Sequence, residues 1–279
     1  MYVGHLGFFI IEILQLPWHS ILVMLYPIVS YFRFLQKATN HHGIHSPFVF
    51  QFVTQCLYDK ESKSYYNDLK RYRQRLLASK EVITVSDFGA GSRVFNSNTR
   101  AVAAIARHAG ASFKRTKLLA RCVAYFRPTS VLELGTSLGI ASVALASQDN
   151  TLVQSIEGCP ATAEIARRYF TEFEIRNVEL VIGQFGESLP KLTKNNYDLI
   201  YFDGNHSKEA TLNYVAMLLP TITNDTVWLF DDIHWSEEMT AAWEEIKALE
   251  QVRVTVDCFW LGFVFFRKEQ VKEHFKVRL

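Results

Sequence analysis

Three carboxylates and one imidazole stand just after two apolar runs in the second half of the chain. Asp203 ends one run, Asp231 and Asp232 end the other, and His206 follows Asp203 by three residues. If both runs are parallel strands, their carboxyl ends meet at one edge of a sheet, where open α/β sheets bind ligands. Buried carboxylates repel one another unless a cation, a hydrogen-bond donor or a shared proton balances them. These residues therefore predict a reaction centre.

An earlier glycine-rich turn has the features of a cofactor loop. The apolar run that starts at Val131 leads into a turn bounded by Gly135 and Gly139, and Glu157 ends the next run, 22 residues after Gly135. A carboxylate at that distance can accept hydrogen bonds from both hydroxyls of a ribose. A second glycine-rich turn, at 85–92, has no acid at the matching distance, so we interpret its Asp87–Ser92 part as a lid or supporting loop.

The composition of the first turn favours S-adenosylmethionine over NAD. The turn reads G-x-x-x-G and lacks the middle glycine that lets backbone approach a pyrophosphate. S-adenosylmethionine carries a sulfonium and an ammonium group, for which an acid at the start of the loop is useful, and Glu133 lies there. We therefore expect the cofactor to be bound by Glu133, Gly135, Ser137, Gly139 and Glu157.

The elements that must position these residues alternate between short apolar runs and helical stretches. The five runs are continuous in apolar character, as in strands covered on both faces, and are 131–135, 153–157, 179–183, 199–203 and 227–231. Two last runs, 252–256 and 259–266, are too close for a helical crossover and predict an antiparallel hairpin. The pattern predicts an α/β fold with a doubly wound, mostly parallel, seven-stranded sheet that ends in this hairpin.

The region before this alternation is helical in its spacing and predicts a cap. Phe48, Phe52 and Cys56, and then Leu69 and Tyr72, recur at three- and four-residue intervals. We expect residues 1–113 to form an N-terminal helical cap with an apolar leader at 1–35. Residues 114–279 would then form the cofactor-binding domain.

The sequence from about Lys114 to Phe266 resembles the class I S-adenosylmethionine-dependent methyltransferases, in the branch that includes catechol O-methyltransferase. The resemblance is carried by Val131–Gly139, by Ile156-Glu157-Gly158 and by the turn Gly183–Pro190. In that family the last turn lies along the adenine, which implies that Gln184, Phe185 and Gly186 are adenine neighbours. Residues 37–48 also resemble the start of a group of bacterial members that begin near Met24, so either Met1 or Met24 is the expected start.

The resemblance implies two alternatives for the reaction centre. In catechol-type relatives two aspartates and an asparagine hold a divalent cation, and a lysine three residues after the first aspartate removes the acceptor's proton. The matching positions here are Asp203, Asp231 and Asp232, with His206 in the place of the lysine. Either the three carboxylates bind Mg²⁺ or Ca²⁺, or the site has no metal and Asp203 orients His206 as a general base. His234 either lines the same mouth or is structural.

Composition limits the partners and the compartment. Thirty Lys and Arg against 28 Asp and Glu give a net charge of +2, too little for a dedicated nucleic-acid binder. The four cysteines lie far apart and form no C-x-x-C pair, so neither a zinc site nor a disulfide framework is indicated. A cytoplasmic protein with a small-molecule acceptor fits best, and a homodimer is one further expectation.

An apolar stretch near the N-terminus complicates this placement. The stretch from Ile13 to Phe32 contains twenty residues without a formal charge, and this length is enough for a membrane span. Pro17 and Pro27 argue against a span, because each leaves backbone groups that lipid cannot satisfy. We favour a buried or interfacial helical segment, with peripheral membrane contact through residues 6–35 as an alternative.

The predicted function is O-methylation of a small apolar or aromatic hydroxyl compound with S-adenosylmethionine. The expected catalytic residues are Asp203, His206 and Asp231, and Asp203 is also expected to border the cofactor. Two other functions are considered. One is a membrane-associated module that binds S-adenosylmethionine without turnover, and the other is a nucleotide-dependent oxidoreductase.

Overall fold

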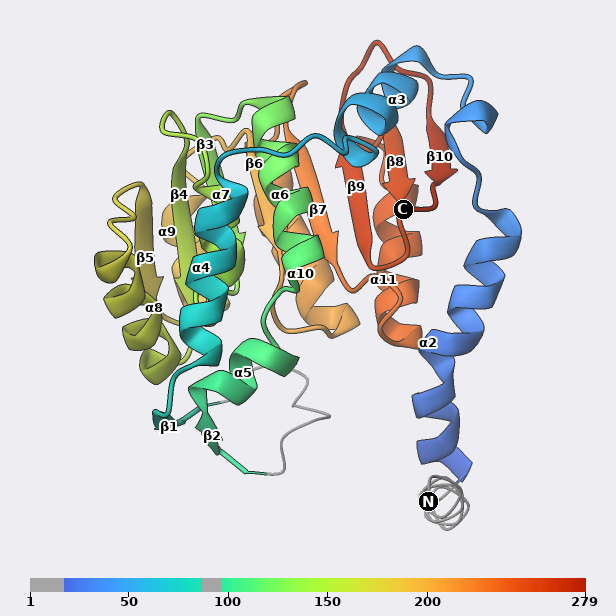
Figure 1. Cartoon of the computed structure of the whole chain (residues 1–279). Helices are drawn as coiled ribbons and strands as arrows, with labels where there is room; N and C mark the ends of the chain where they lie inside the picture. Colours follow the sequence, from blue (N-terminus) through green and yellow to red (C-terminus); the bar gives the residue numbers. More distant parts are fainter. Residues whose placement is uncertain (1–17, 87–96) are drawn as a thin grey trace.

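The computed structural model describes residues 18–86 and 97–279, with side chains described from Leu25 onward. Two expectations fall wholly or partly outside these residues. The Asp87–Ser92 loop is one of them, and the start of the chain, with most of the apolar leader, is the other. The remainder folds into a central sheet with helices on both faces (Figure 1).

Within residues 18–86 and 97–279, eight strands form the central sheet, in the order β10-β8-β9-β7-β6-β3-β4-β5. They are β3 Ser130–Leu134, β4 Leu152–Glu157, β5 Val178–Ile182, β6 Leu199–Phe202, β7 Val227–Asp231, β8 Val254–Asp257, β9 Leu261–Phe265 and β10 Glu273–Lys276. All neighbouring pairs are parallel except those of β9, which runs antiparallel to β7 and β8. Strand β3 has β4 on one side and β6 on the other. The sheet therefore reverses its winding at β3 and β6, which is where open sheets bind ligands.

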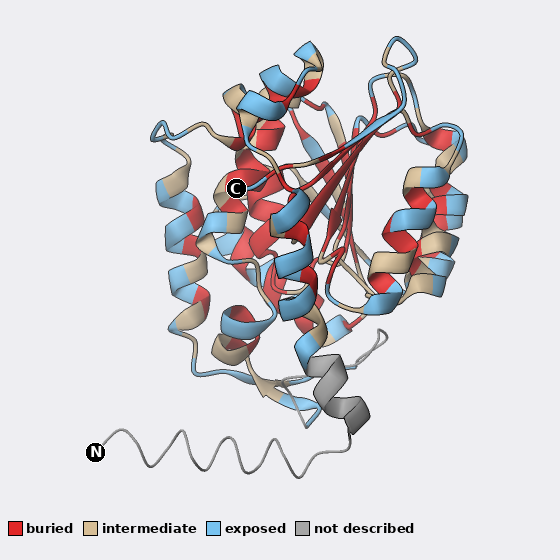
Figure 2. Ribbon diagram, turned by 90° about the vertical axis from the view of Figure 1, so that its right-hand side faces the viewer, coloured by how far each residue is buried: buried red, intermediate tan, exposed pale blue. Residues whose placement is uncertain are grey.

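The helices cover the sheet as two outer layers. One layer contains α3 Pro47–Phe52, the π-helical η2 Val53–Leu57, α4 Tyr66–Leu77, α5 Val102–His108, α6 Phe113–Phe126, α7 Ile140–Leu145 and α8 Pro160–Glu172. The other contains α9 Phe185–Leu192, α10 Lys208–Leu218, the short η3 Leu219–Thr221 and α11 Glu237–Ala248. Figure 2 shows the buried sheet between them.

Alternation along the strands explains why two apolar cores form. Val131 faces the core under α6 and α7, whereas its neighbour Leu132 faces the core under α10 and α11, and both side chains are fully buried. Leu229 and Trp228 divide between the two cores in the same way. Successive strand residues point to opposite faces, so a continuously apolar strand fills both cores at once.

The predicted α/β architecture is confirmed, with one correction to the strand count. The five apolar runs are strands β3 to β7, and the C-terminal pair is an antiparallel hairpin. The main sheet has eight strands, because β10 pairs in parallel with β8. Strand β10 lies at the sheet edge and has Glu273, His274 and Lys276 around a single buried Phe275. Polar edge strands are common because they discourage further pairing, and they give no apolar run to find.

The N-terminal region contacts both the sheet edge and one apolar core. Thr39 pairs with Val277 beyond β10, and Phe52 and Cys56 lie in the same buried cluster as strand residues such as Val131. Strands β1 Val82–Thr84 and β2 Thr99–Ala101 form a separate two-stranded sheet, so the strand that precedes the glycine-rich turn at 85–92 does not belong to the main sheet. The domain boundary at residue 113 stays a prediction.

The apolar stretch is partly helical. Helix α2 covers Trp18–Lys37 and contains Pro27, and a 3-10 turn, η1, follows at His41–Gly43. Phe34 is buried and stands near Phe259, whereas Ile28 and Phe32 are exposed. Within the described part of the chain, no helix has the length and apolarity needed to cross a membrane.

Candidate active site

The loop after β3 is held in a conformation that needs glycine. Gly135 has φ +108° and Gly139 has φ +76°, in the left-handed region that side chains rarely adopt. A Cβ atom on Gly135 would lie 2.1 Å from the carbonyl oxygen of Asp203, and one on Gly139 would lie 2.5 Å from the Phe170 ring. Gly135 therefore lets the loop after β3 touch the loop after β6, so the predicted cofactor loop adjoins the predicted reaction centre.

Glu157 lies at the end of β4 and holds this loop. Its Oε2 accepts a hydrogen bond from the Ser137 amide at 2.7 Å, and its Oε1 accepts one from the Cys159 amide at 2.8 Å. The side chain is half-buried rather than free in solvent. Because each carboxylate oxygen has two lone pairs, both can still accept a hydroxyl hydrogen.

Glu133 lies beneath the loop and has no exposed surface. Its Oε2 accepts hydrogen bonds from the hydroxyls of Ser142 and Ser155, and its Oε1 is buried without a hydrogen-bond partner in the structure. Burial raises the pKa of Glu133 to about 7, although the two hydroxyls act against this rise. The contacts shown support the loop from below, and direct binding of the cofactor by Glu133 stays a prediction.

Two of the three predicted adenine neighbours differ in their surroundings. Gln184 is exposed and precedes α9, whereas Phe185 is half-buried against Tyr214, with ring centroids 5.3 Å apart. A Cβ atom on Gly204 would lie 2.6 Å from the Phe185 ring. Phe185 therefore packs directly on the loop after β6, beside Asp203.

The three aspartates of the predicted reaction centre face one arginine. The Arg115 guanidinium donates from one terminal nitrogen to Asp231 Oδ2 and from the other to Asp232 Oδ1, each at 3.0 Å. The Arg115 side chain is 29% exposed and that of Asp231 only 6%. A forked contact of this kind is among the stronger charge-assisted hydrogen-bond arrangements in proteins.

Arg115 is held both at its backbone amide and at its guanidinium. Ser112 caps α6 and accepts the Arg115 amide at 3.3 Å, and the guanidinium lies over the Trp260 ring at 4.6 Å. The Trp260 carbonyl accepts the Asp232 amide at 2.7 Å, and Asp232 has φ +52°. Trp260 thus holds both the arginine and the backbone of one of its carboxylate partners.

Asp203 and His206 complete the cluster. Asp203 Oδ2 accepts the Tyr201 hydroxyl at 3.2 Å, and Asp203 Oδ1 lies 3.8 Å from His206 Nε2, too far for a hydrogen bond. The side chains of Asp203 and His206 are 22% and 29% exposed, so the cluster reaches solvent.

Burial dominates the electrostatics of this cluster. Burial, and then repulsion from Asp232, raise the pKa of Asp203 to about 8 and that of Asp231 well above its usual range. Desolvation lowers the pKa of His206. At neutral pH the cluster therefore holds a proton among its carboxyls in addition to the Arg115 charge, while the imidazole is neutral.

Sequence reasoning missed Arg115 and left the role of His234 open. Arg115 lies 116 residues from Asp231 in a helix that precedes the first strand of the main sheet, and no local motif marks it. His234 is buried, and its Nε2 lies 2.9 Å from Asp257 Oδ2 while its Nδ1 lies 3.1 Å from the Thr240 hydroxyl. Through these two contacts, His234 joins the end of β8 to α11.

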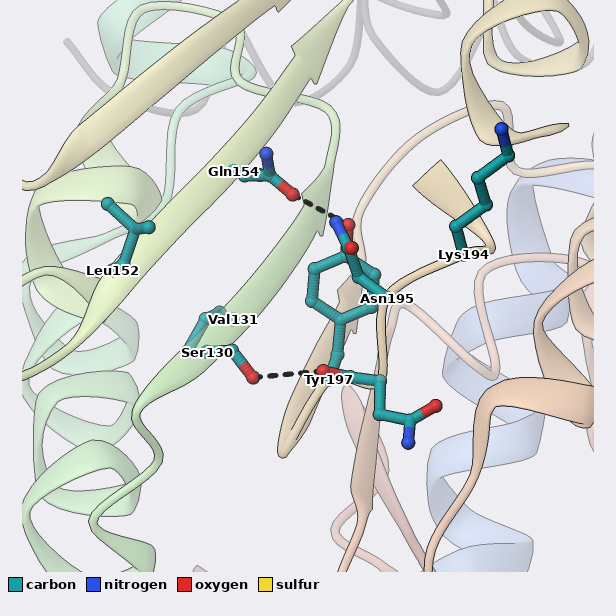
Figure 3. A pocket seen from close by; sticks show the side chains of 8 residues that line it. Ser130, Val131, Leu152, Gln154, Lys194, Asn195 and Tyr197 are labelled. Carbon is teal, nitrogen blue, oxygen red and sulfur yellow. Dashed lines mark hydrogen bonds between the residues drawn. The ribbon is translucent and has the colours of Figure 1, made fainter. Parts of the chain in front are cut away.

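A separate depression of about 460 Å³ lies at the amino ends of the central strands, opposite the site described above (Figure 3). It is lined by residues at the start of β3 and β4 and just before β6, among them Ser130, Leu152 and Tyr197. The Tyr197 hydroxyl donates to Oε1 of Gln154, another lining residue, at 2.6 Å. Because it faces the amino ends of the strands, this depression is not the site described above.

Comparison with known proteins identifies the central segment. Residues 132–233 match the family model described as "Methyltransferase domain". No curated protein matches the chain by sequence.

Solved structures share the fold at low identity. A Podospora anserina methyltransferase with bound S-adenosylhomocysteine has a TM-score of 0.56 at 13% identity, covering 80% of this chain and 97% of that one. The Streptomyces achromogenes O-methyltransferase TomG, solved with S-adenosylmethionine, has a TM-score of 0.52 at 14% identity, covering 74% of this chain and 91% of that one. A cofactor-bound Mycobacterium tuberculosis protein has a TM-score of 0.52 at 18% identity, covering 81% of this chain and 99% of that one.

Proposed function

We propose that the chain is a class I S-adenosylmethionine-dependent methyltransferase that methylates the hydroxyl group of a small apolar or aromatic compound. The match of residues 132–233 to the methyltransferase domain family model and the fold shared with solved methyltransferases support this proposal. The proposal depends on one observation, the contact between the glycine loop after β3 and the Asp203 loop after β6. A methyl donor on the first loop would lie beside a proton acceptor on the second, as an in-line displacement requires.

The loop after β3 fits the cofactor. Gly135 and Gly139 keep its surface free of side chains, Glu157 has lone pairs left for two ribose hydroxyls, and Phe185 offers a ring beside them. The orphaned Glu133 Oε1 is a further acceptor next to the loop. When bound, S-adenosylmethionine supplies an electrophilic methyl group on a sulfonium.

His206 is the proposed general base. Its imidazole is neutral at pH 7 because desolvation lowers its pKa, and it is partly exposed beside Asp203. The imidazole would take the proton from the acceptor hydroxyl as the acceptor oxygen forms its bond to carbon. Asp203 Oδ1 lies 3.8 Å from His206 Nε2, so orientation of the ring by Asp203 would require the two side chains to move closer together.

Two tryptophans favour an apolar or aromatic acceptor. Trp260 lies under Arg115, and Trp235, which follows Asp232 by three residues, is 37% exposed. An exposed indole beside a polar cluster suits a flat, apolar molecule with one polar group.

Methyl transfer from labelled S-adenosylmethionine to a panel of phenols and aliphatic alcohols tests the proposal. We expect wild-type protein to label at least one hydroxyl compound and His206→Ala to lower that rate about 100-fold, the usual worth of acid–base catalysis. His45→Ala, an exposed histidine far along the sequence from the site, is the matched control and should keep full activity. Undiminished turnover in His206→Ala would exclude the proposed base.

The two other functions that the sequence suggested, binding without turnover and nucleotide-dependent oxidoreduction, receive no support from the comparisons. Peripheral membrane contact through residues 6–35 and homodimer formation stay predictions. Vesicle sedimentation and light scattering, respectively, would test them.

A further inference from the structure

The residues that match a catechol-type metal site do not fit a metal here, because Arg115 already binds two of the three, Asp231 and Asp232. Asp231 Oδ2 and Asp232 Oδ1 each accept a guanidinium hydrogen bond at 3.0 Å. A divalent cation needs such oxygens at about 2.0 to 2.6 Å and would be repelled by the adjacent guanidinium. Across residues 25–86 and 97–279, no group of three His, Cys, Asp or Glu side chains is arranged to hold a metal ion.

We propose that the Arg115 guanidinium is the resident cation of the acceptor site, in the place that a divalent metal takes in catechol-type enzymes, and that it binds the acceptor oxygen directly. This inference rests on the proposed methyl transfer. It makes turnover independent of divalent metal, and it assigns to Arg115 a catalytic role that the sequence did not suggest.

The arginine is built into the site and is not a chance surface ion pair. Its guanidinium is stacked on Trp260, its amide is capped by Ser112, and one partner, Asp231, is buried. Asp232 is held at a positive φ by the Trp260 carbonyl. A strained residue of this kind persists only where its surroundings determine it, and such residues cluster at functional sites.

The guanidinium also has donors to spare. Arginine has five N–H groups in a fixed plane, of which the two aspartates use two. The side chain keeps 29% of its surface exposed, on the edge of the sheet where Asp203 and His206 also reach solvent. An acceptor oxygen that loses its proton to His206 would gain negative charge within reach of a fixed positive charge, which lowers the barrier as an oxyanion-binding group does.

Titration of the purified full-length protein with Mn²⁺, followed by the electron paramagnetic resonance signal of the free ion, tests the metal part without turnover. We expect wild-type protein to show no stoichiometric Mn²⁺ site. Arg115→Ala frees the carboxylates and should bind one equivalent, which Arg115→Ala/Asp232→Asn should lose. Lys114→Ala, an exposed lysine in the same helical turn, is the matched control and should behave as wild type.

Either of two results would overturn the inference. One is a Mn²⁺ equivalent on wild-type protein that Asp232→Asn removes, which can be measured even if Arg115→Ala does not fold. The other is a folded Arg115→Ala protein that binds no Mn²⁺.

Methyl-transfer rates form the second part of the test. With any hydroxyl acceptor that the wild type methylates, EDTA should leave the rate unchanged, and Arg115→Ala should lower kcat/KM about 100-fold, as loss of an oxyanion-binding donor does. Added Mn²⁺ should restore part of the activity of Arg115→Ala, which a merely structural role would not allow. Loss of wild-type activity in EDTA would contradict the inference. If no acceptor is methylated, the proposed function fails, while the Mn²⁺ titration still decides what occupies the carboxylates.

Discussion

The two halves of the site are held in different ways. The half after β3 and β4 is mainly backbone: glycines at positive φ, and a Glu157 carboxylate that accepts two backbone amides. The half after β6 and β7 is held by charge, with three aspartates around Arg115. The two meet where Gly135 touches the Asp203 carbonyl.

We propose that this difference corresponds to two roles, with the first half binding the cofactor and the second half binding the acceptor. Every part of the first half comes from a stretch of about 30 residues, so a local sequence pattern specifies it. The second half needs Arg115, which lies 116 residues from Asp231. If this comparison is right, substitutions in the first half should change cofactor binding and stability, and those in the second half should change acceptor turnover.

Gly135→Ala should have the largest effect, because it disrupts the contact between the halves. The new Cβ would lie 2.1 Å from the Asp203 carbonyl, at a φ that alanine rarely adopts. Overpacking and backbone strain together should cost about 3 kcal/mol or more in the free energy of unfolding. Urea unfolding and calorimetry with S-adenosylmethionine measure both consequences.

Gly186→Ala is the control for that substitution. Its Cβ would have nothing within 4 Å, in the exposed first turn of α9. We expect the free energy of unfolding to stay the same or to rise slightly, since alanine is the better helix former. Equal effects at the two glycines would contradict the close approach at Gly135.

Glu133→Gln should change the pH dependence of stability. The pKa of Glu133 is raised from 4.5 to about 7 in the folded protein, so the folded state binds more protons than the unfolded state in that window. The free energy of unfolding should therefore fall as pH rises from 4.5 to 7, by about 3 kcal/mol at 1.4 kcal/mol per unit.

Urea unfolding at pH 5 and pH 8 tests this prediction. In Glu133→Gln the free energy of unfolding should fall less between these two pH values than in wild type, because the contribution of the Glu133 carboxyl is gone. In Glu209→Gln, which replaces an exposed carboxylate on α10, it should fall as much as in wild type. Parallel declines in Glu133→Gln and wild type would mean that the buried carboxyl ionises as freely as it does in the unfolded chain.

Glu157→Ala should weaken S-adenosylmethionine binding about tenfold, or about 1.4 kcal/mol. It removes the anchors of the Ser137 and Cys159 amides and, on our proposal, two hydrogen bonds to the ribose hydroxyls. Calorimetry should show this loss, with Glu164→Ala, an exposed position on α8, binding as wild type. Unchanged affinity in Glu157→Ala would remove the assigned ribose contact.

Trp260→Leu should have the smallest effect and should be confined to the acceptor half. The stacked guanidinium contributes about 0.5 to 1 kcal/mol at a partly exposed site. We expect the acceptor KM to rise three- to fivefold while the Kd for S-adenosylmethionine stays the same. A change in cofactor affinity of similar size would show that the two halves are not independent.

Most of the sheet could be predicted because its strands are buried on both faces. Strand β6 and residues 227–230 of β7 are continuous apolar segments, which helices of a soluble protein seldom show at that length. Strand β3 is interrupted by Glu133, and β4 by Gln154 and Ser155, so these two runs are only partly apolar. Strand β10 could not be predicted, since its only buried side chain is Phe275 and it exists because β8 offers an open edge. The short sheet of β1 and β2 likewise has no apolar run to mark it.

The sequence by itself determined the fold class and the convergence of three aspartates, and it predicts the glycine loop that would bind the cofactor, because glycine positions and strand ends can be read from local sequence. Only the tertiary structure decided which cation faces those aspartates. The charge balance of a buried cluster depends on whichever side chain the packing of α6 against the sheet delivers, and a helix that shows several basic residues in its sequence does not mark which one points inward. Arg115 is that residue, and its position changes the chemistry expected of the site.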